Sequence, residues 1–404
     1  MTRLVLRFLI FLRAVRPAAG GVRRSANAVT VLLFLVGLAF PLYGYLFHDP
    51  APPRNEFRPL FPSPVVPRST GDLRLFPAAF EPYFNDRVGY RQTLLDWQRA
   101  VVFDALGDAT VKDVWVGREG WLYLDVAVKR DAPAPPLATW ADALADRHAW
   151  CAARGVVYVA FIAPEKSEIY PEYLPGRLSD RPPPDLITGL GDHLRGTPVR
   201  FVDVRPALSA AKRDEPAPVY FRLDSHWTPV GALASYQAVG REIARAVPGF
   251  VPTPVAAFRR SLATFQNQDL SRMLGCTPEH CAAEAENVTG PRAAAARGLS
   301  EPARAALAGV KILEIEALSE SECPSAPDTP AVALGDSFSR LLVTPYRNDF
   351  RRLTTVATHD FPAALIEQER PKVVVQEIVY RRLREAPPTD PVDVAGARLR
   401  VGGR

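Results

Sequence analysis

The sequence predicts an α/β fold, a three-layer α/β/α sandwich with a mostly parallel central sheet, preceded by one transmembrane helix. Two observations predict it. Five short apolar runs of strand length alternate with helical patterns, as in parallel sheets that are covered on both faces. An uncharged segment of 20 residues also lies close to the N-terminus. Hydrophobic residues make up 48% and charged residues 23% of the 404 residues, which excludes a wholly disordered or fibrous chain.

The uncharged segment covers residues 28–47, which at about 1.5 Å per residue is long enough to cross a hydrocarbon core of ~30 Å. A cleaved signal peptide is the alternative, but the apolar run is long and no small-residue cleavage pattern follows it. Six arginines and no acidic residue precede Asp49, which places the N-terminus in the cytoplasm. We therefore predict a single-pass membrane protein, with a cytoplasmic tail (1–27) and an exported main part.

The net charge of +5 is concentrated at the N-terminus. Because residues 1–48 carry +6, the remainder carries −1. A nearly neutral globular part has no basic surface that could follow a phosphate backbone, so nucleic acid is not an expected partner.

The four cysteines bear on the predicted compartment, because disulfides persist only where thiols are not kept reduced. Cys276 and Cys281 lie close together beside His280, and Cys323 lies further along. This spacing matches no paired Cys-x-x-Cys zinc pattern, so one disulfide among these three cysteines is expected, with its pairing open. Cys151 lies on an apolar helix face and is expected to be an inert buried thiol.

The remaining elements follow along the chain. Residues 48–71 are rich in proline and predict a stiff stalk, followed by one domain over 72–390 and a tail over 391–404. Apolar side chains recur at helical spacing in 91–106 and 140–151. The five predicted strands are GVVYVAFIA (155–163), VRFVDV (199–204), AVAL (331–334), LTTVAT (353–358) and VVVQEIV (373–379). A polar, alanine-rich stretch at 252–310 predicts an insertion over the sheet.

The strand at 331–334 runs into Gly335, Asp336 and Ser337 and then into a short helical stretch. A serine at such a turn exposes its hydroxyl beyond the carboxyl end of the strand, where open α/β sheets bind ligands. Its own backbone N–H can help to stabilise an oxyanion. Alone the motif is weak, because Gly-Asp-Ser is common in turns and Ser337 could simply cap the helix.

A second motif is the Asp-x-His pair of Asp224 and His226. Thr228 and Pro229 are typical of a helix N-cap and first turn, so the pair lies on the loop just before a helix. One residue apart in extended chain, the two side chains can point the same way, and the carboxylate can accept the Nδ1 proton. Nε2 is then free to act as a base. The alternative is a purely structural histidine beside Trp227.

Serine, histidine and aspartate on the loops of one α/β scaffold favour nucleophilic catalysis by Ser337, His226 and Asp224. A metal site would need more ligands, and His359 with Asp360 is the only other obvious source of them. No metal is therefore predicted.

Five segments, in order, resemble the AlgJ/AlgX type of SGNH-hydrolase-like polysaccharide O-acetyltransferases, known from alginate acetylation. They are FEPYFNDRVGYR (80–91), VWVGREGWLYLD (114–125), APEKSEIYPEYLP (163–175), LDSHW (223–227) and LGDSFS (334–339). The resemblance covers most of residues 75–383. It implies an SGNH-like fold in which Asp and His precede the nucleophile, as if circularly permuted.

The resemblance also implies substrate-binding roles for Lys166, Tyr170 and Arg381. Two departures stand out. Ser225 replaces the more usual threonine, and Tyr380 precedes Arg381 where glutamate is expected.

The resemblance implies an O-acetyltransferase that is anchored in the bacterial inner membrane with its catalytic domain in the periplasm. Such an enzyme moves acetyl groups onto hydroxyls of an exopolysaccharide through an acetyl-serine. It further implies a multi-pass membrane O-acyltransferase as acetyl donor. No cofactor is expected, since the exported part has no recognisable phosphate-binding loop. A periplasmic SGNH-type carbohydrate acetylesterase and a non-catalytic scaffold of a polysaccharide-modification complex are the alternatives.

Overall fold

The computed structural model describes residues 21–47, 61–87, 89–90, 110–111, 113–125, 136–175, 178, 184–266, 268–274 and 282–388. The chain divides into two compact units, residues 1–101 and 102–404. The helix predicted at 91–106, residues 48–60 of the predicted stalk and the tail after 390 lie outside the described residues.

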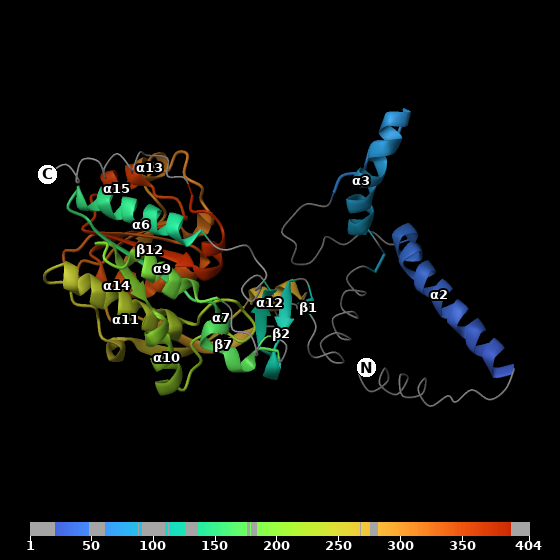
Figure 1. Ribbon diagram of the computed structural model, residues 1–404, viewed down its shortest axis with the longest axis horizontal. Coiled ribbons are helices and arrows are strands. Elements are labelled where there is room, and N and C mark those ends of the chain that lie inside the picture. The colour runs from blue at the N-terminus through green and yellow to red at the C-terminus, as the bar shows by residue number, and fades with distance from the viewer. Residues whose placement is uncertain are drawn as a thin grey trace. The chain divides into compact units, whose positions relative to one another are not determined.

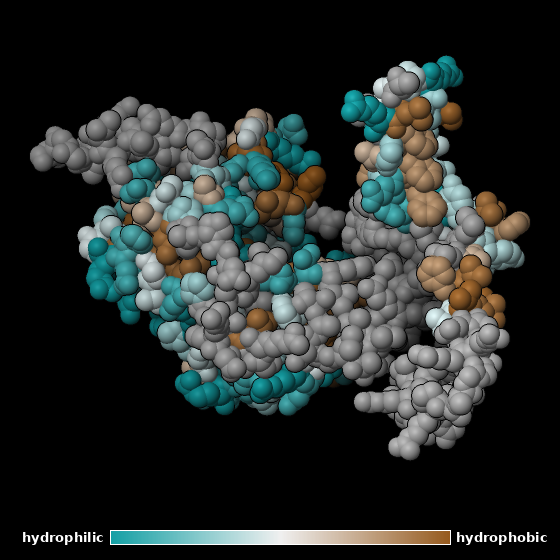
Figure 2. Space-filling model, turned by 45° about the vertical axis from the view of Figure 1, so that its right-hand side comes forward, coloured by the Kyte–Doolittle hydropathy of each residue, from teal (hydrophilic) through white to brown (hydrophobic). Residues whose placement is uncertain are grey.

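The first unit contains two described helices, α2 (Gly21–Phe47) and α3 (Thr70–Arg87). Large apolar side chains are exposed on α2, among them Leu32 and Phe34, and apolar surface on this unit is visible in Figure 2. Nevertheless, within the described ranges no helix is long and apolar enough to cross a membrane. The segment 28–47 is helical, as predicted, but its helix α2 is not among helices long and apolar enough to cross a membrane within the described residues.

The second unit is built on a seven-stranded sheet. In spatial order its strands are β5 (Arg200–Asp203), β4 (Val157–Ala163), β12 (Val373–Val379), β10 (Ala331–Gly335), β11 (Arg352–Ala357), β9 (Ser319–Glu322) and β8 (Ala295–Arg297). The first five run parallel to one another, β9 runs antiparallel to β11, and β8 runs antiparallel to β9. All five predicted strands form, and the prediction of a mostly parallel sheet is confirmed.

Helices cover both faces of this sheet (Figure 1). Alternate residues of β4 point to opposite faces, so Tyr158 and Ile162 join one apolar core while Val159 and Phe161 join the other. The first core is covered by α6 (Leu137–Ala152), α9 (Leu186–Leu194), α13 (Glu301–Ala305) and α15 (Ala363–Glu369), and the second by α10 (Arg205–Asp214), α11 (Pro229–Ala246) and α14 (Val343–Asp349). Burial on both faces is why these strands are apolar throughout.

Smaller elements surround this core. They are an antiparallel sheet of β1 (Thr110–Val111), β2 (Val114–Val116) and β3 (Leu122–Leu124), a pair of β6 (Arg259–Phe265) and β7 (Ala283–Thr289), the short helices α7 (Lys166–Ile169) and α12 (Asp269–Met273), and 3-10 turns at Arg118–Gly120, Pro171–Tyr173, Val255–Ala257, Ile315–Ala317, Ser337–Leu342 and Tyr380–Arg384. The stretch 252–310 is thus not solely an excursion over the sheet, because its β8 forms the sheet's edge against β9.

Two of the four cysteines are described, and both are buried free thiols. Cys151 lies fully buried in α6, where burial raises the pKa of its thiol to about 12, consistent with an inert group. Cys323 is also buried. Because Cys276 and Cys281 lie outside the described residues, a bond between those two stays a prediction.

Candidate active site

The turn after β10 presents Ser337 at the carboxyl end of the strand. Asp336 fixes this turn, since its carboxylate accepts hydrogen bonds from the N–H groups of Phe338 (3.0 Å) and Val379 (2.9 Å). Gly335 allows a close approach, because a Cβ there would lie 2.7 Å from Glu377 Oε2. As a result Ser337 is only half-buried, while its two neighbours are buried.

The loop before α11 presents Asp224 and His226. It is closed by backbone hydrogen bonds from Phe221 N to His226 O (3.1 Å) and from Thr228 N to Val219 O (3.0 Å). The Thr228 hydroxyl accepts from Gly231 N, so it caps α11, and Pro229 lies in the first turn, as predicted. The pair therefore lies on a constrained loop at the helix N-terminus.

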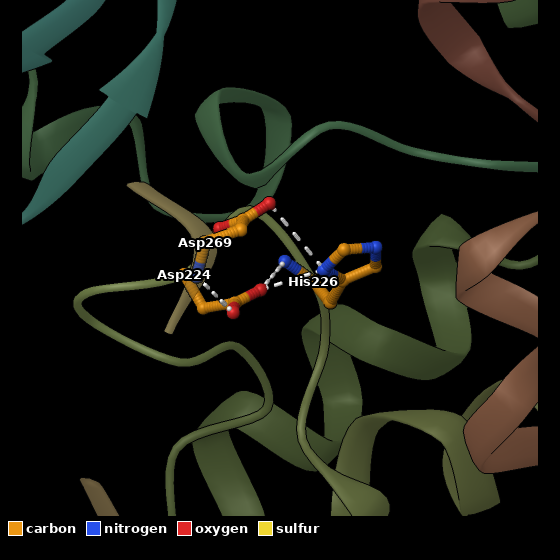
Figure 3. A group of neighbouring side chains, drawn as sticks. All are labelled: Asp224, His226 and Asp269. Carbon is orange, nitrogen blue, oxygen red and sulfur yellow. Dashed lines mark hydrogen bonds and ion pairs between the residues drawn. The ribbon is translucent and has the colours of Figure 1, made fainter. Parts of the chain in front are cut away.

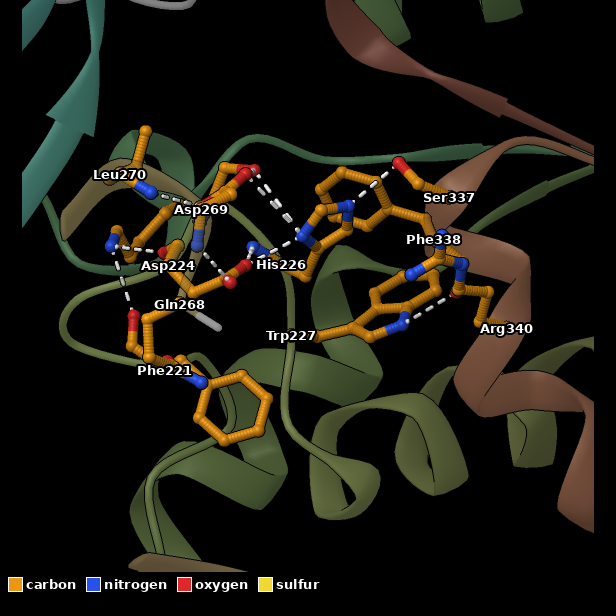
Figure 4. Close-up of polar contacts among 12 residues, drawn as sticks. Phe221, Asp224, His226, Trp227, Gln268, Asp269, Leu270, Ser337, Phe338 and Arg340 are labelled. Atoms are coloured by element: carbon orange, nitrogen blue, oxygen red, sulfur yellow. Dashed lines mark hydrogen bonds and ion pairs between the residues drawn. The ribbon is translucent and has the colours of Figure 1, made fainter. Parts of the chain in front are cut away.

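The structure brings the three predicted catalytic side chains into one hydrogen-bonded row (Figure 4). His226 Nδ1 lies 2.6 Å from Asp224 Oδ1, and His226 Nε2 lies 2.7 Å from Ser337 Oγ. In this order Asp224 accepts the Nδ1 proton and Nε2 faces the serine hydroxyl. This is the arrangement that a serine nucleophile needs in order to pass its proton to a base.

Aromatic contacts hold the histidine loop against the serine turn. Trp227 Nε1 donates to the carbonyl of Phe338 at 3.0 Å, and the two rings meet edge to face with centroids 5.1 Å apart. The Phe338 ring also lies 4.6 Å from the His226 ring. These contacts fix two segments that are 111 residues apart in sequence.

Asp269, at the start of α12, is a site residue that sequence reasoning missed (Figure 3). Its backbone N–H donates to Asp224 Oδ2 at 2.7 Å, and its Oδ2 lies 3.7 Å from His226 Nδ1. Its carboxylate accepts from the backbone N–H of Ser225 (2.7 Å) and from the Ser225 hydroxyl. It lies in the stretch 252–310, where no motif points to it.

Asp224, His226 and Asp269 also place possible metal-ligand atoms within 4.8 Å of one another. However, each carboxylate oxygen already accepts a hydrogen bond from the protein: those of Asp224 from His226 and Asp269, and those of Asp269 from Ser225. A cation would have to displace these N–H and O–H donors. The donor pattern therefore favours an oriented histidine over a metal site.

Charges around His226 set its protonation. Burial alone would lower the pKa of His226, but the hydrogen bond to Asp224 and the charges of Asp224 and Asp269 outweigh it and raise the pKa above its ordinary value. Burial would raise the pKa of Asp224, but its hydrogen bonds to His226 and the charge of His226 outweigh burial and lower this pKa to about 2. Burial raises the pKa of Asp269, helped by the nearby charge of Asp224.

The three residues predicted to bind substrate have different surroundings. Lys166 is buried, and its Nζ donates to the carbonyls of Phe221 (2.9 Å), Arg222 (3.1 Å) and Asp224 (2.6 Å). These contacts hold the Asp-x-His loop and leave Lys166 facing protein, which differs from the predicted role. The reason is that the loop folds back over α7, a long-range contact that the sequence motif does not reveal.

Tyr170 is also buried. Its hydroxyl accepts from Val219 N at 3.0 Å and its ring stacks on Trp121 at 4.4 Å, so it too contacts protein. Arg381 donates to Glu165 at 2.9 Å, and its guanidinium lies 5.7 Å from the Phe338 ring. Arg381 thus lies beside the serine turn, with 22% of its side chain exposed.

Comparison with known sequences connects this geometry to a family. Residues 114–312 match the family model described as the SGNH hydrolase-like domain of acetyltransferase AlgX. The chain is 30% identical over 141 residues to the probable alginate O-acetylase AlgJ of Pseudomonas aeruginosa, which covers 32% of this chain and 33% of that protein. The chain therefore matches about a third of the length of this relative.

Solved structures share the fold. A DHHW family protein from Eubacterium siraeum has a TM-score of 0.51 at 14% identity, covering 72% of this chain and 96% of that one. PatB1 from Bacillus cereus with a sulfonyl adduct has a TM-score of 0.50 at 14% identity, covering 67% and 96%. The sequence matches confirm the predicted resemblance to the AlgX/AlgJ family of SGNH hydrolase-like acetyltransferases.

Proposed function

We propose that this protein is an O-acetyltransferase that moves acetyl groups onto hydroxyls of an exopolysaccharide through an acetyl-serine intermediate. The observation that supports this most directly is the row of Asp224, His226 and Ser337, with 2.6 Å and 2.7 Å between successive side-chain atoms. The match to the acetyltransferase family model supports acetyl as the group that is transferred. The AlgJ relative, named as a probable alginate O-acetylase, supports a polysaccharide as the acceptor.

In the first half-reaction Ser337 Oγ attacks the acetyl carbonyl while His226 Nε2 takes its proton. Asp224 stabilises the imidazolium that forms. The tetrahedral intermediate collapses, the bond to the leaving group breaks, and His226 returns the proton to that group. In the second half His226 takes the proton of a sugar hydroxyl, whose oxygen attacks acetyl-Ser337. The new ester leaves, and Ser337 regains its proton from His226.

The turn also limits which backbone groups can bind the oxyanion. The N–H of Phe338 already donates to Asp336 at 3.0 Å. The N–H of Ser337 has no acceptor within the described part of the chain, and it lies on the nucleophile itself. We therefore assign Ser337 N–H as one oxyanion donor.

The decisive experiment compares Ser337→Ala with Ser339→Ala, a matched change in the same turn whose hydroxyl only donates to Asp336 O. Each purified full-length protein receives a simple acetyl ester, with and without a glycan acceptor. We expect Ser337→Ala to lose activity by about a thousandfold or more and Ser339→Ala to stay within a few-fold of wild type. Activity retained in folded Ser337→Ala protein would refute the assignment.

The same assay separates the alternative functions. Acetyl transferred to the glycan supports the transferase, and acetyl released only to water indicates a carbohydrate acetylesterase, since both reactions share the acetyl-serine. Neither product would indicate a scaffold. Mass spectrometry of the stalled intermediate should place one acetyl group on Ser337.

We further propose that the domain acts outside the cytoplasm and takes its acetyl groups from a multi-pass membrane O-acyltransferase. The sequence supports this through its resemblance to the AlgJ type and through the lack of a recognisable phosphate-binding loop. A C-terminal reporter that works only after export tests the location. An inactive reporter on stable, full-length protein would contradict it.

A further inference from the structure

Asp269 contacts every residue of the Asp-Ser-His segment. Its N–H holds Asp224 Oδ2 (2.7 Å), its Oδ1 accepts from Ser225 N (2.7 Å), and its Oδ2 lies 3.7 Å from His226 Nδ1. The bond to Asp224 occupies the oxygen that does not face the imidazole, so it restricts rotation of that carboxylate. Asp269 thus contacts both Asp224 and His226.

Three charged side chains act on the imidazole, and a fourth, Lys166, acts on two of those three. Asp224 and Asp269 lie on its Nδ1 side, Arg381 comes from the turn after β12, and Lys166 comes from α7 and interacts with both carboxylates. Ser337 Oγ faces Nε2. Arg381 opposes the charged imidazole, whereas the two carboxylates favour it. The balance between the two carboxylates and the nearby cations therefore determines the protonation state of His226.

The Ser225 hydroxyl moderates the second carboxylate, because it donates to Asp269 Oδ2, the oxygen nearest His226. A hydrogen bond to that oxygen reduces the negative charge felt at Nδ1. A threonine at this position has the same hydroxyl. This gives a physical reason why serine and threonine could exchange here.

We propose that Asp269 is a fourth member of the site, a positioning residue that fixes the Asp224 carboxylate and adds a second negative charge behind His226, moderated by the Ser225 hydroxyl. The proposal rests on the proposed function of the triad. In both half-reactions His226 becomes positive while it holds a proton, so a second carboxylate stabilises that stage. The same charge keeps His226 protonated at mildly acidic pH, where it cannot act as a base.

The test is the titration of His226 in full-length protein with isotope-labelled histidine, followed by NMR and assigned with His226→Gln. Asp269→Asn keeps the size and removes the charge, so the His226 pKa should fall by about one pH unit. Ser225→Ala removes the moderating donor and should raise this pKa by a few tenths of a pH unit. Ser225→Thr should titrate as wild type.

The acidic limb of kcat/KM should move in the same direction as the titration in each variant. An unchanged His226 titration in folded Asp269→Asn protein would overturn the proposal. Should that variant not fold, equal titrations in Ser225→Ala and Ser225→Thr would overturn it. The titration needs no turnover, so loss of the proposed function would be visible separately, in the Ser337→Ala assay.

Discussion

At the residue scale, Lys166 shows how a buried amine can support a loop through the backbone carbonyls of that loop. Burial lowers its pKa to about 7, while the charges of Asp269, Asp224 and Glu165 act in the opposite direction. Its three N–H donors match three backbone carbonyls of the segment 221–224. The lysine therefore supplies hydrogen-bond donors to three carbonyls of this loop.

We predict that Lys166→Met lowers the free energy of unfolding by about 3 kcal/mol, because methionine fills the space but leaves buried carbonyls without donors. Activity should fall as well, since the loop carries Asp224. The matched control is Lys212→Met. Lys212 donates to Ile169 O and pairs with Glu172 at a more exposed position, so its loss should be about 1 kcal/mol. Equal losses in urea unfolding would contradict this reading.

A pH prediction concerns Asp224. Its pKa is lowered to about 2, below the ~3.9 of an unfolded aspartate. A lowered pKa contributes stability that is present above the unfolded value and lost as the pH falls through the folded value. The pairing with Asp224 also raises the pKa of His226, and that contribution is lost as the pH rises above the unfolded histidine value of ~6.5. The unfolding free energies of wild type and Asp224→Asn should therefore differ most between about pH 4 and 6.5, and converge between about pH 4 and 2. A gap that stays constant over this range would count against it.

The sequence predicted the triad residues because the Asp-x-His pair is local and the serine turn follows a recognisable buried strand. It did not predict the roles of Asp269 and Lys166. Asp269 reaches the pair across 45 residues and Lys166 across 58, through contacts made only when separate loops pack together. No periodicity or spacing encodes such contacts.

At the element scale, the position of the histidine loop depends on one glycine of helix α11, Gly231, which packs against the backbone before the loop. A Cβ on Gly231 would lie 2.1 Å from the Val219 carbonyl oxygen, closer than atoms can approach. The first turn of α11 thus packs directly against the backbone that leads into the loop. Glycine at this point is a requirement of packing, since Gly231 is not in the left-handed region.

Gly231→Ala should therefore push the histidine loop away from Ser337 and lower both stability and activity. Gly191→Ala in α9 is the matched control, because its Cβ would meet the Phe201 ring at 3.6 Å, an ordinary contact. There alanine should stabilise the helix by up to ~1 kcal/mol. Thermal melts and acetyl-ester turnover of the two variants test the difference. Similar melting temperatures and turnover rates in the two variants would show that the close approach at Gly231 does not matter for stability or activity.

Strand prediction succeeded where burial is two-sided. In β10 and β12 every residue is buried, so the apolar run is unbroken and easy to recognise. The edge strand β8 (AAR) and its neighbour β9 (SESE) escaped prediction, because both strands are short and neither contains an apolar run. The antiparallel end of the sheet, which includes part of the stretch 252–310, was missed for this reason.

At the scale of the whole molecule, the parallel sheet explains why distant segments meet. The serine turn follows β10, and Glu377 near the end of the adjacent β12 accepts from Asp336 N at 2.9 Å. The histidine loop is held from α7, which follows β4, the next strand beyond β12. Carboxyl ends of parallel strands share one edge of the sheet, so segments from three strands converge there.

The last prediction concerns the source of acetyl groups. Acetyl-CoA is bulky and anionic, and the sequence after residue 48 has no glycine-rich or basic phosphate-binding motif of the recognisable kinds. Purified full-length protein should therefore take acetyl from a small neutral ester but not from acetyl-CoA. In cells, acetylation of the polymer should need both this protein and a membrane O-acyltransferase, with Ser337→Ala as the control that keeps the partner but removes the nucleophile. Efficient glycan acetylation by the purified protein with acetyl-CoA alone would refute the dependence on a donor protein. The protein would then have to bind the phosphates of acetyl-CoA at a site that no known sequence motif describes.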